Sequence, residues 1–203
     1  METIRSPMAE YGVAKFALPG EGESGDQHLV CCNETGILIA AIDGIGHGAE
    51  AANAAKTAVT VLRNGVGEPI IPLVITCHEK LRATRGVVLS IASVDVRHGL
   101  MTWLGVGNVH GVLVRADKKL TQETLLLRAG VVGDHLPQLQ AAVLPVGQGD
   151  LLVFATDGIR TGFTGTLFSL ENPQRAADRI LKAFSNRSDD ALVLALRVTG
   201  IRL

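Results

Sequence analysis

The sequence contains few cysteines and few aromatic side chains. Its three cysteines, Cys31, Cys32 and Cys77, have no CxxC spacing, so we expect buried structural thiols and neither a disulfide framework nor a zinc knuckle. One Trp and one Tyr among 203 residues are too few for a surface that stacks the bases of single-stranded nucleic acid. Disulfide-stabilised, zinc-knuckle and base-stacking classes are therefore disfavoured.

The sequence also lacks an excess of charge of one sign and lacks long hydrophobic runs. The formal net charge is -1 at pH 7, which provides no basic surface for nucleic acid or an anionic membrane. The apolar runs are far shorter than the roughly 18 residues that span a bilayer, and the first ten residues lack the pattern of a secretion signal. We expect a cytoplasmic protein with one domain, residues 1–203, without a sensor or regulatory extension.

The most informative stretch runs from Gly36 to Asn53. Ile37–Ile42 is entirely apolar, which is typical of a strand buried on both faces, and the strand ends at Asp43. Three of the next five residues are glycines, which allow a tight turn and the close approach of a ligand to the main chain. An alanine-rich helix, Gly48–Arg63, follows. A carboxylate at the end of such a rigid strand is suited to hold a hard cation.

The remaining chain predicts an α+β protein. Further helices are expected from Pro69 to about Thr84 and from Asn172 to Phe184. Further strands are expected at Tyr11–Leu18, Leu29–Asn33, Val87–Val96, Met101–Val106, Val109–Arg115, Thr124–Leu127, Asp150–Thr156 and in a last segment ending at Val198. The strands between residues 87 and 127 are expected to form an antiparallel meander. Strands grouped in the middle of the chain favour α+β over alternating βαβ units.

Acidic residues lie where these apolar strands begin or end. Asp26 precedes the strand that we expect to form a hairpin with Ile37–Ile42, so its carboxylate should meet that of Asp43. Asp157 ends a second strand with the same Asp-Gly step, and Asp189 with Asp190 precedes the last strand. A single acid at such a place is usually a turn or a helix cap, but four comparable places favour a shared cation.

This constellation predicts metal-assisted phosphoester hydrolysis. Carboxylate and carbonyl oxygens suit Mg²⁺ or Mn²⁺, whereas the histidines have no paired ligand spacing. Two such ions, roughly 3.5 to 4 Å apart, activate a water and clamp phosphoryl oxygens during in-line displacement. A pocket of carboxylates alone would repel a phosphate group. Bound metal ions would reverse the sign of the charge and allow the phosphate to bind.

Four motifs resemble the signature motifs of the PPM-type (protein phosphatase 2C-like) metal-dependent protein serine/threonine phosphatases. They are SGD at Ser24–Asp26, AIDGIGHG at Ala41–Gly48, ATDGI at Ala155–Ile159 and SDDALVLAL at Ser188–Leu196, in the order of the family. The chain is most similar to the SpoIIE-like bacterial branch, and within it to the small, sensor-free stressosome phosphatase. The resemblance implies a central sandwich of two antiparallel β-sheets flanked by pairs of helices, in layers α-β-β-α.

The resemblance also implies a ligand set for two Mn²⁺ or Mg²⁺ ions. Asp26 would lie in or beside the coordination shell, and Asp189 is favoured over its neighbour Asp190 as a ligand. The complete implied metal set is Asp26, Asp43 as the bridge between the ions, Gly44 through its carbonyl, Asp157, and Asp189 or Asp190. The expected catalytic residues are Asp43 and Asp157, with His47 as a further candidate from its position beside the acids. The implied substrates are phosphorylated STAS-domain stressosome scaffold proteins, dephosphorylated by a monomeric enzyme as negative feedback in a bacterial stress response.

Two roles stay open in the sequence. His47 lies between two glycines beside the acids, where it either donates a proton to the leaving serine oxygen or caps the following helix. Eukaryotic members of the family carry an arginine ahead of the first acid that holds phosphate. Here only Arg5 and Lys15 precede Asp26 in comparable positions, without matching context, and Arg160 is another candidate for phosphate contact.

Two alternative functions are weighed against the phosphatase. The strand, the turn Gly44-x-Gly46-x-x-Ala49 and the helix satisfy the glycine fingerprint of a dinucleotide-binding module. Against it, Asp43 would face the pyrophosphate, and no second strand ending in an acid follows after about 20 residues. The other alternative is a catalytically silent phosphatase-like binding domain, which the presence of all four acidic motifs disfavours.

Overall fold

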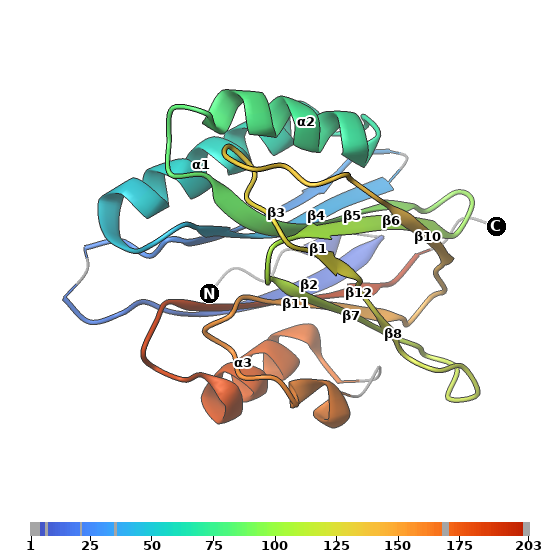
Figure 1. The fold of residues 1–203 in the computed structure, drawn as a ribbon. Coiled ribbons are helices and arrows are strands. Elements are labelled where there is room, and N and C mark those ends of the chain that lie inside the picture. Colours follow the sequence, from blue (N-terminus) through green and yellow to red (C-terminus); the bar gives the residue numbers. More distant parts are fainter. Residues whose placement is uncertain (1–4, 7, 21, 35, 168–170, 201–203) are drawn as a thin grey trace.

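The structure, a computed structural model, has four layers. It describes residues 5–6, 8–20, 22–34, 36–167 and 171–200, without the side chains of residues 5 and 6. Helices α1 and α2 lie above one sheet, a second sheet packs beneath the first, and α3 lies below (Figure 1). These layers confirm the predicted α+β sandwich.

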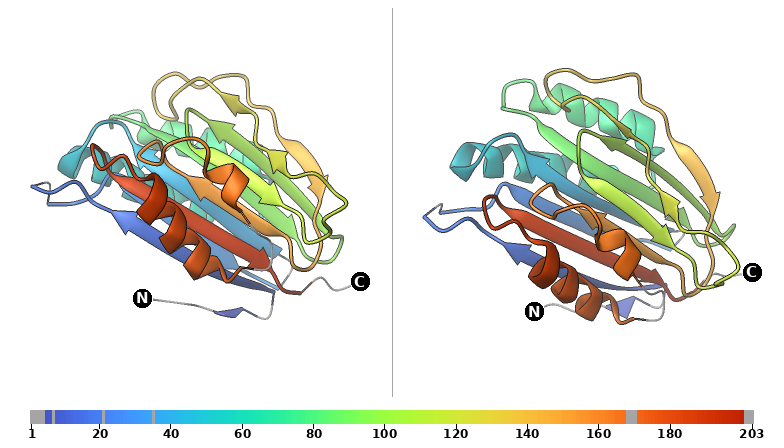
Figure 2. Two further views of the ribbon diagram at one scale, coloured as in Figure 1. Left: turned by 90° about the horizontal axis from the view of Figure 1, so that it is seen from below. Right: turned by 60° about the horizontal axis from the view of Figure 1, so that its bottom comes forward.

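Both sheets are almost entirely antiparallel. Sheet I has the order β10 (Ala142–Pro145), β6 (Leu100–Val106), β5 (Val87–Asp95), β4 (Gly36–Gly44) and β3 (Asp26–Cys32), with β9 (Leu127–Arg128) parallel to β6. Sheet II has the order β1 (Arg5–Ser6), β2 (Ala9–Phe16), β12 (Ala191–Val198), β11 (Leu151–Ala155), β7 (His110–Val114) and β8 (Glu123–Thr124). The two sheets stack along their length in both views of Figure 2.

The helices cover the outer faces of the sheets unequally. The helices α1 (Gly48–Asn64) and α2 (Ile70–Leu81) pack on sheet I. Sheet II carries α3 (Pro173–Phe184), together with the short 3-10 helix η1 (Phe163–Thr166), whose first residue joins the same apolar core. The pair of helices expected on each face is therefore present on sheet I, while in the described residues of sheet II the second helix is a single 3-10 turn.

The apolar run of β4 is explained by burial on both faces. Ile37, Ile39 and Ala41 belong to the core between the sheets, and the alternate residues Leu38, Ala40 and Ile42 belong to the core beneath α1 and α2. Because successive strand residues point to opposite faces, a strand in an inner layer needs apolar residues at every position. This burial holds β4, and the acid near its end, in a fixed place.

The antiparallel meander predicted for residues 87 to 127 is only partly correct. β5 pairs with β6 and β7 pairs with β8, both antiparallel, but the two pairs belong to different sheets. The chain leaves sheet I at the end of β6 and enters sheet II at β7, so Gly107 and Asn108 cross between the sheets. Gly107 has a φ of 92° and donates its N–H to the carbonyl of Arg128 at 2.8 Å. The predicted strand Thr124–Leu127 is divided in the same way, since β8 pairs with β7 in sheet II and β9 with β6 in sheet I.

Two other expectations are also corrected. β4 runs antiparallel to both neighbours, β3 and β5, whereas a dinucleotide-binding unit requires parallel strands joined by a helix. The dinucleotide alternative is therefore wrong. Cys77 is buried as expected, but Cys32 is exposed at the end of β3.

In the described part of the chain, no helix combines the length and the apolar character needed to cross a membrane.

Candidate active site

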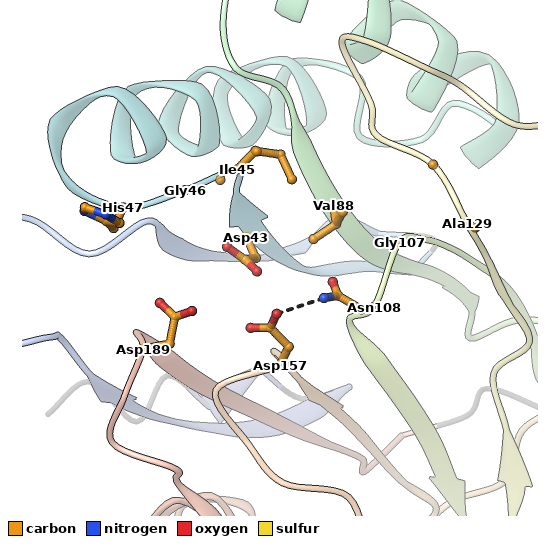
Figure 3. A pocket seen from close by; sticks show the side chains of 12 residues that line it. Asp43, Ile45, Gly46, His47, Val88, Gly107, Asn108, Ala129, Asp157 and Asp189 are labelled. Carbon is orange, nitrogen blue, oxygen red and sulfur yellow. Dashed lines mark hydrogen bonds between the residues drawn. The ribbon is translucent and has the colours of Figure 1, made fainter.

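A cavity of about 460 Å³ opens at one end of the sandwich. Its lining comes from both sheets: Asp43 and Val88 belong to sheet I, while Asp157 follows β11 and Asp189 precedes β12 of sheet II. Figure 3 shows the carboxylates of Asp43, Asp157 and Asp189 facing a common space. The structure thus brings together three of the acids predicted from strand ends.

Asp26 lies directly behind Asp43. The two residues are opposite each other in the β3–β4 pairing, which confirms that the hairpin makes them meet. Asp26 is only 1% exposed, and its Oδ2 accepts a hydrogen bond of 2.7 Å from the hydroxyl of Thr156, at the end of β11. The carboxylate of Asp26 therefore links sheet I to sheet II beneath the cavity.

Glycine is required at the turn that follows Asp43. A Cβ on Gly44 would lie 2.2 Å from the carbonyl oxygen of Ala51, so only glycine lets α1 pack this close to the end of β4. Gly46 has a φ of 87°, a left-handed conformation that disfavours other residues. The N–H of Ile45 donates to the carbonyl of Gly86 at 3.1 Å. The turn is thereby held against the start of β5, with the N-terminus of α1 beside the cavity.

Asn108, which sequence reasoning treated only as a turn residue, contacts the acid cluster. Its side-chain amide donates to Oδ2 of Asp157 at 2.8 Å (Figure 3). The bond helps to orient the Asp157 carboxylate. Asn108 and Asp157 are 49 positions apart, and the crossing between the sheets brings them into contact. Apart from the Gly-Asn turn, the sequence has no local pattern that predicts this contact.

Asp189 and Asp190 have different environments. Asp190 is buried, and its two carboxylate oxygens accept backbone N–H groups of Leu18 and Gly25 at 2.8 and 2.6 Å. Asp189 lines the cavity, and its Oδ1 accepts the N–H of Asp190. Asp190 therefore ties the segment before β3 to the start of β12, whereas the carboxylate of Asp189 is available at the cavity.

The acid cluster is electrostatically unfavourable without a cation. Burial raises the pKa of Asp43, and the negative charges of Asp26 and Asp157 raise it further. Burial likewise raises the pKa of Asp26, although the hydrogen bond from Thr156 opposes the shift. The pKa of Asp157 is raised by burial and by Asp189. Each of these shifts reflects a carboxylate whose charge the site does not compensate.

Hard divalent ions fit this donor set. Several carboxylates and a glycine-rich turn without thiolates present the oxygen donors that Mg²⁺ and Mn²⁺ prefer. Within the described residues, no group of three or more His, Cys, Asp or Glu side chains is gathered as in a preformed metal site. The acids at the cavity therefore offer oxygen donors without forming a closed set of ligands.

The other residues singled out in the sequence are placed as follows. His47 lines the cavity (Figure 3), and its side chain makes no capping hydrogen bond to α1. Arg160 donates to the carbonyls of Ala183 and Phe184 at the end of α3, so its guanidinium is directed to that helix. The Nζ of Lys15 donates to the backbone carbonyl of Asp26 at 3.3 Å. Gly44 lines the cavity at the end of β4.

The sequence matches a family model and a curated relative. The model described as Stage II sporulation protein E (SpoIIE) matches residues 33–199. Phosphoserine phosphatase RsbX of Bacillus subtilis (strain 168) is 25% identical over 100 residues, which cover 48% of this chain and 50% of that protein. The match thus spans about half the length of the curated relative. RsbX is also the phosphatase that the four sequence motifs resemble.

Solved structures with the same fold extend over nearly the whole chain. One, described as the bacterial stressosome, a modular system adapted to control secondary messenger signaling, is 32% identical, has a TM-score of 0.85 and is matched over 93% of this chain and 99% of its own. The crystal structure of RsbX in complex with magnesium has a TM-score of 0.87 at 18% identity, with 98% and 99% covered. The catalytic domain of the serine/threonine protein phosphatase PstP in complex with two manganese ions has a TM-score of 0.71 at 16% identity, with 95% and 99% covered.

Proposed function

Because the chain belongs to the SpoIIE family of PP2C-type phosphatases, we propose that it is a Mn²⁺- or Mg²⁺-dependent phosphatase of phosphoserine and phosphothreonine in proteins. The observation that carries this proposal is the convergence of Asp43, Asp157 and Asp189, from two different sheets, on one cavity. Their negative charge would repel a phosphate group directly, whereas it is well suited to binding divalent cations.

The proposed ligands of two ions are the carboxylates at the cavity. Asp43, at the end of β4, is the proposed bridge between the ions, with Asp157 and Asp189 as ligands from sheet II. The Gly44 carbonyl and the buried Asp26 complete the proposed set beside them. When bound, the ions supply the positive charge that attracts a phosphate dianion and lowers the pKa of water.

The remaining residues of the site have supporting roles in this proposal. Asn108 holds the carboxylate of Asp157 in one orientation through its amide. Asp190 holds the segment that contains Asp26 by accepting the N–H of Gly25. His47, at the mouth of the cavity, is the proposed proton donor to the serine or threonine oxygen that leaves phosphorus.

A first experiment tests the metal-dependent activity. The purified protein with Mn²⁺ is expected to hydrolyse a phosphoserine peptide and p-nitrophenyl phosphate, and EDTA should stop both reactions. Asp43→Asn and Asp157→Asn should each lower kcat/KM at least about 100-fold, because each removes a proposed ligand. Hydrolysis that survives both EDTA and the two substitutions would refute the proposal. Phosphopeptide binding without hydrolysis would favour the catalytically silent binding domain.

The proposed substrates are phosphorylated STAS-domain proteins of the stressosome. The support is the 32% identity to a chain in a structure whose description names the bacterial stressosome, and the similarity to RsbX, which is described as a phosphoserine phosphatase. The test compares kcat/KM for a phosphorylated stressosome scaffold with kcat/KM for unrelated phosphoproteins at equal Mn²⁺. We expect a preference of at least about tenfold for the scaffold, and equal values would contradict this assignment.

A further inference from the structure

The candidate active site presents much negative charge and little that could hold the substrate phosphate. Among the described residues that line the cavity, three are aspartates and none is lysine or arginine. Proteins recognise phosphate oxygens most specifically through arginine, whose planar guanidinium donates two parallel hydrogen bonds. An arginine that contacts the phosphate would have to reach it from just outside the lining.

Arg85 lies against the rim of the cavity. A Cβ on Gly46, a lining residue, would be 2.7 Å from Nη1 of Arg85. The guanidinium therefore packs over the glycine turn that follows Asp43. By contrast, Arg160 is hydrogen bonded to the end of α3, and Lys15 to the backbone of Asp26.

The backbone that carries Arg85 is fixed to this turn. The next residue, Gly86, accepts the N–H of Ile45 at 3.1 Å. The N–H of Gly86 in turn donates to the hydroxyl of Thr84, which itself donates to the carbonyl of Leu81 at the end of α2. These bonds tie the backbone on both sides of Arg85 to the glycine turn and to the end of α2.

The guanidinium has a partner that a phosphate can replace. Nη2 of Arg85 forms an ion pair with Glu50 in the first turn of α1. The two side chains are 49% and 71% exposed, and an ion pair in water of this kind contributes little to stability. Glu50 therefore keeps the arginine at the rim without binding it strongly, whereas a phosphate dianion offers more charge and more acceptor oxygens.

We propose that Arg85 binds the phosphate group of the substrate at the rim of the cavity, exchanging Glu50 for phosphate oxygens when the phosphoserine enters. This inference rests on the proposed function. The carboxylates would meet the phosphate through divalent ions, and Arg85 would meet it directly, beside the turn Gly44–Gly48.

The test combines kinetics with direct binding of inorganic phosphate. With Mn²⁺ and a phosphoserine peptide, Arg85→Ala should raise KM about tenfold or more while kcat changes by less than about threefold. Calorimetry with the metal-loaded protein should show that the Kd for inorganic phosphate rises by a similar factor. Arg85→Lys should be intermediate, because ammonium keeps the charge without the planar fork. Glu50→Gln should leave KM unchanged or lower it, because it frees the arginine.

A matched control and a separate readout keep the outcomes distinct. Arg82→Ala removes an exposed arginine from the same connection after α2 and should change neither KM nor the phosphate Kd. Thermal unfolding shows whether Arg85→Ala is folded, and Arg85→Lys serves if it is not. Unchanged KM and phosphate Kd in the folded Arg85 variant would overturn this inference. A different result would separate the two proposals. If the wild type did not hydrolyse the peptide but Arg85→Ala still bound phosphate more weakly than the wild type, the proposed function would be refuted and the assignment of Arg85 as a phosphate-binding residue would stand.

Discussion

Asp189 and Asp190 are adjacent in the sequence but have different environments in the structure. Asp190 accepts two backbone N–H groups and is 6% exposed, so Asp190→Asn should lower the free energy of unfolding of the metal-free protein by about 1–3 kcal/mol. Asp189→Asn changes an exposed side chain and should alter that free energy by less than about 1 kcal/mol. It should instead raise the Mn²⁺ concentration for half-maximal activity at least about tenfold.

Urea unfolding and a Mn²⁺ titration of activity, applied to both variants, measure these effects. The assignment of Asp189 as the ligand would be wrong if Asp190→Asn were fully stable and Asp189→Asn kept the wild-type response to Mn²⁺.

Asn108 provides a second prediction at the scale of one residue. Asn108→Ala removes the amide that orients the Asp157 carboxylate, so the affinity for Mn²⁺ should fall about 10- to 100-fold. Calorimetric titration with Mn²⁺ measures the affinity independently of activity.

The exposed Asn186→Ala, outside the cavity lining, is the matched control and should bind Mn²⁺ as the wild type does. If Asn108→Ala also kept the wild-type affinity for Mn²⁺, the amide would have no positioning role.

The residues of the site differ in how far the sequence could predict them. Asp43 and Asp157 could be found because each ends an unmistakably apolar strand with the same Asp-Gly step. Asn108 and Arg85 could not, since neither has a local pattern of chemistry. Their contacts with the cavity arise from the crossing between the sheets and from the connection after α2.

At the scale of elements, the spacing between β4 and α1 controls the position of Asp43. Gly44→Ala would place a methyl group 2.2 Å from the carbonyl oxygen of Ala51, and the backbone has to move to relieve this contact. We expect a loss of about 1–3 kcal/mol in the free energy of unfolding and a fall in Mn²⁺ affinity, because the displaced turn also moves Asp43.

Gly22→Ala is the control for this substitution, since the space around a Cβ at Gly22 is open. Denaturation in urea and Mn²⁺ binding should both be near wild type in that variant. A Gly44→Ala protein as stable as Gly22→Ala would show that α1 can move away from β4 at no cost.

The length of an element decides whether the sequence pattern predicts it correctly. The helix predicted at Gly48–Arg63 matches α1 (Gly48–Asn64) because its alanine face is long enough to be periodic. The predicted strand Thr124–Leu127 is wrong because β8 and β9 have only two residues each and pair with different sheets. Two residues carry no alternation, and local sequence does not encode the sheet that a strand joins.

At the scale of the whole molecule, the acid cluster lies on the seam between the two sheets. Asp26 and Asp43 come from sheet I, and Asp157 and Asp189 from the ends of β11 and β12 in sheet II. The α+β class followed from the order of elements, whereas the stacking of two sheets was expected only from the family resemblance. Pairing between distant strands, such as β2 with β12, depends on contacts that no local pattern contains.

This placement predicts that divalent cations stabilise the entire fold. A ligand that binds only the folded protein adds about 2.7 kcal/mol to the free energy of unfolding at 100 times its Kd, which corresponds to a rise in Tm of roughly 5–10 °C for a protein of this size. Mn²⁺ and Mg²⁺ should produce such a rise, because ions held between carboxylates of both sheets are released when the sheets separate. EDTA should reverse it.

The variant Asp43→Asn separates this linkage from a general effect of salt. Without metal it should be at least as stable as the metal-free wild type, because it removes a partly buried carboxylate from a cluster of like charges. With Mn²⁺ its Tm should rise by no more than about 2 °C, whereas a general salt effect would raise the Tm of both proteins equally. Differential scanning calorimetry of the two proteins, each with and without Mn²⁺, measures all four values. Equal rises in both would mean that the ions bind elsewhere than between the two sheets.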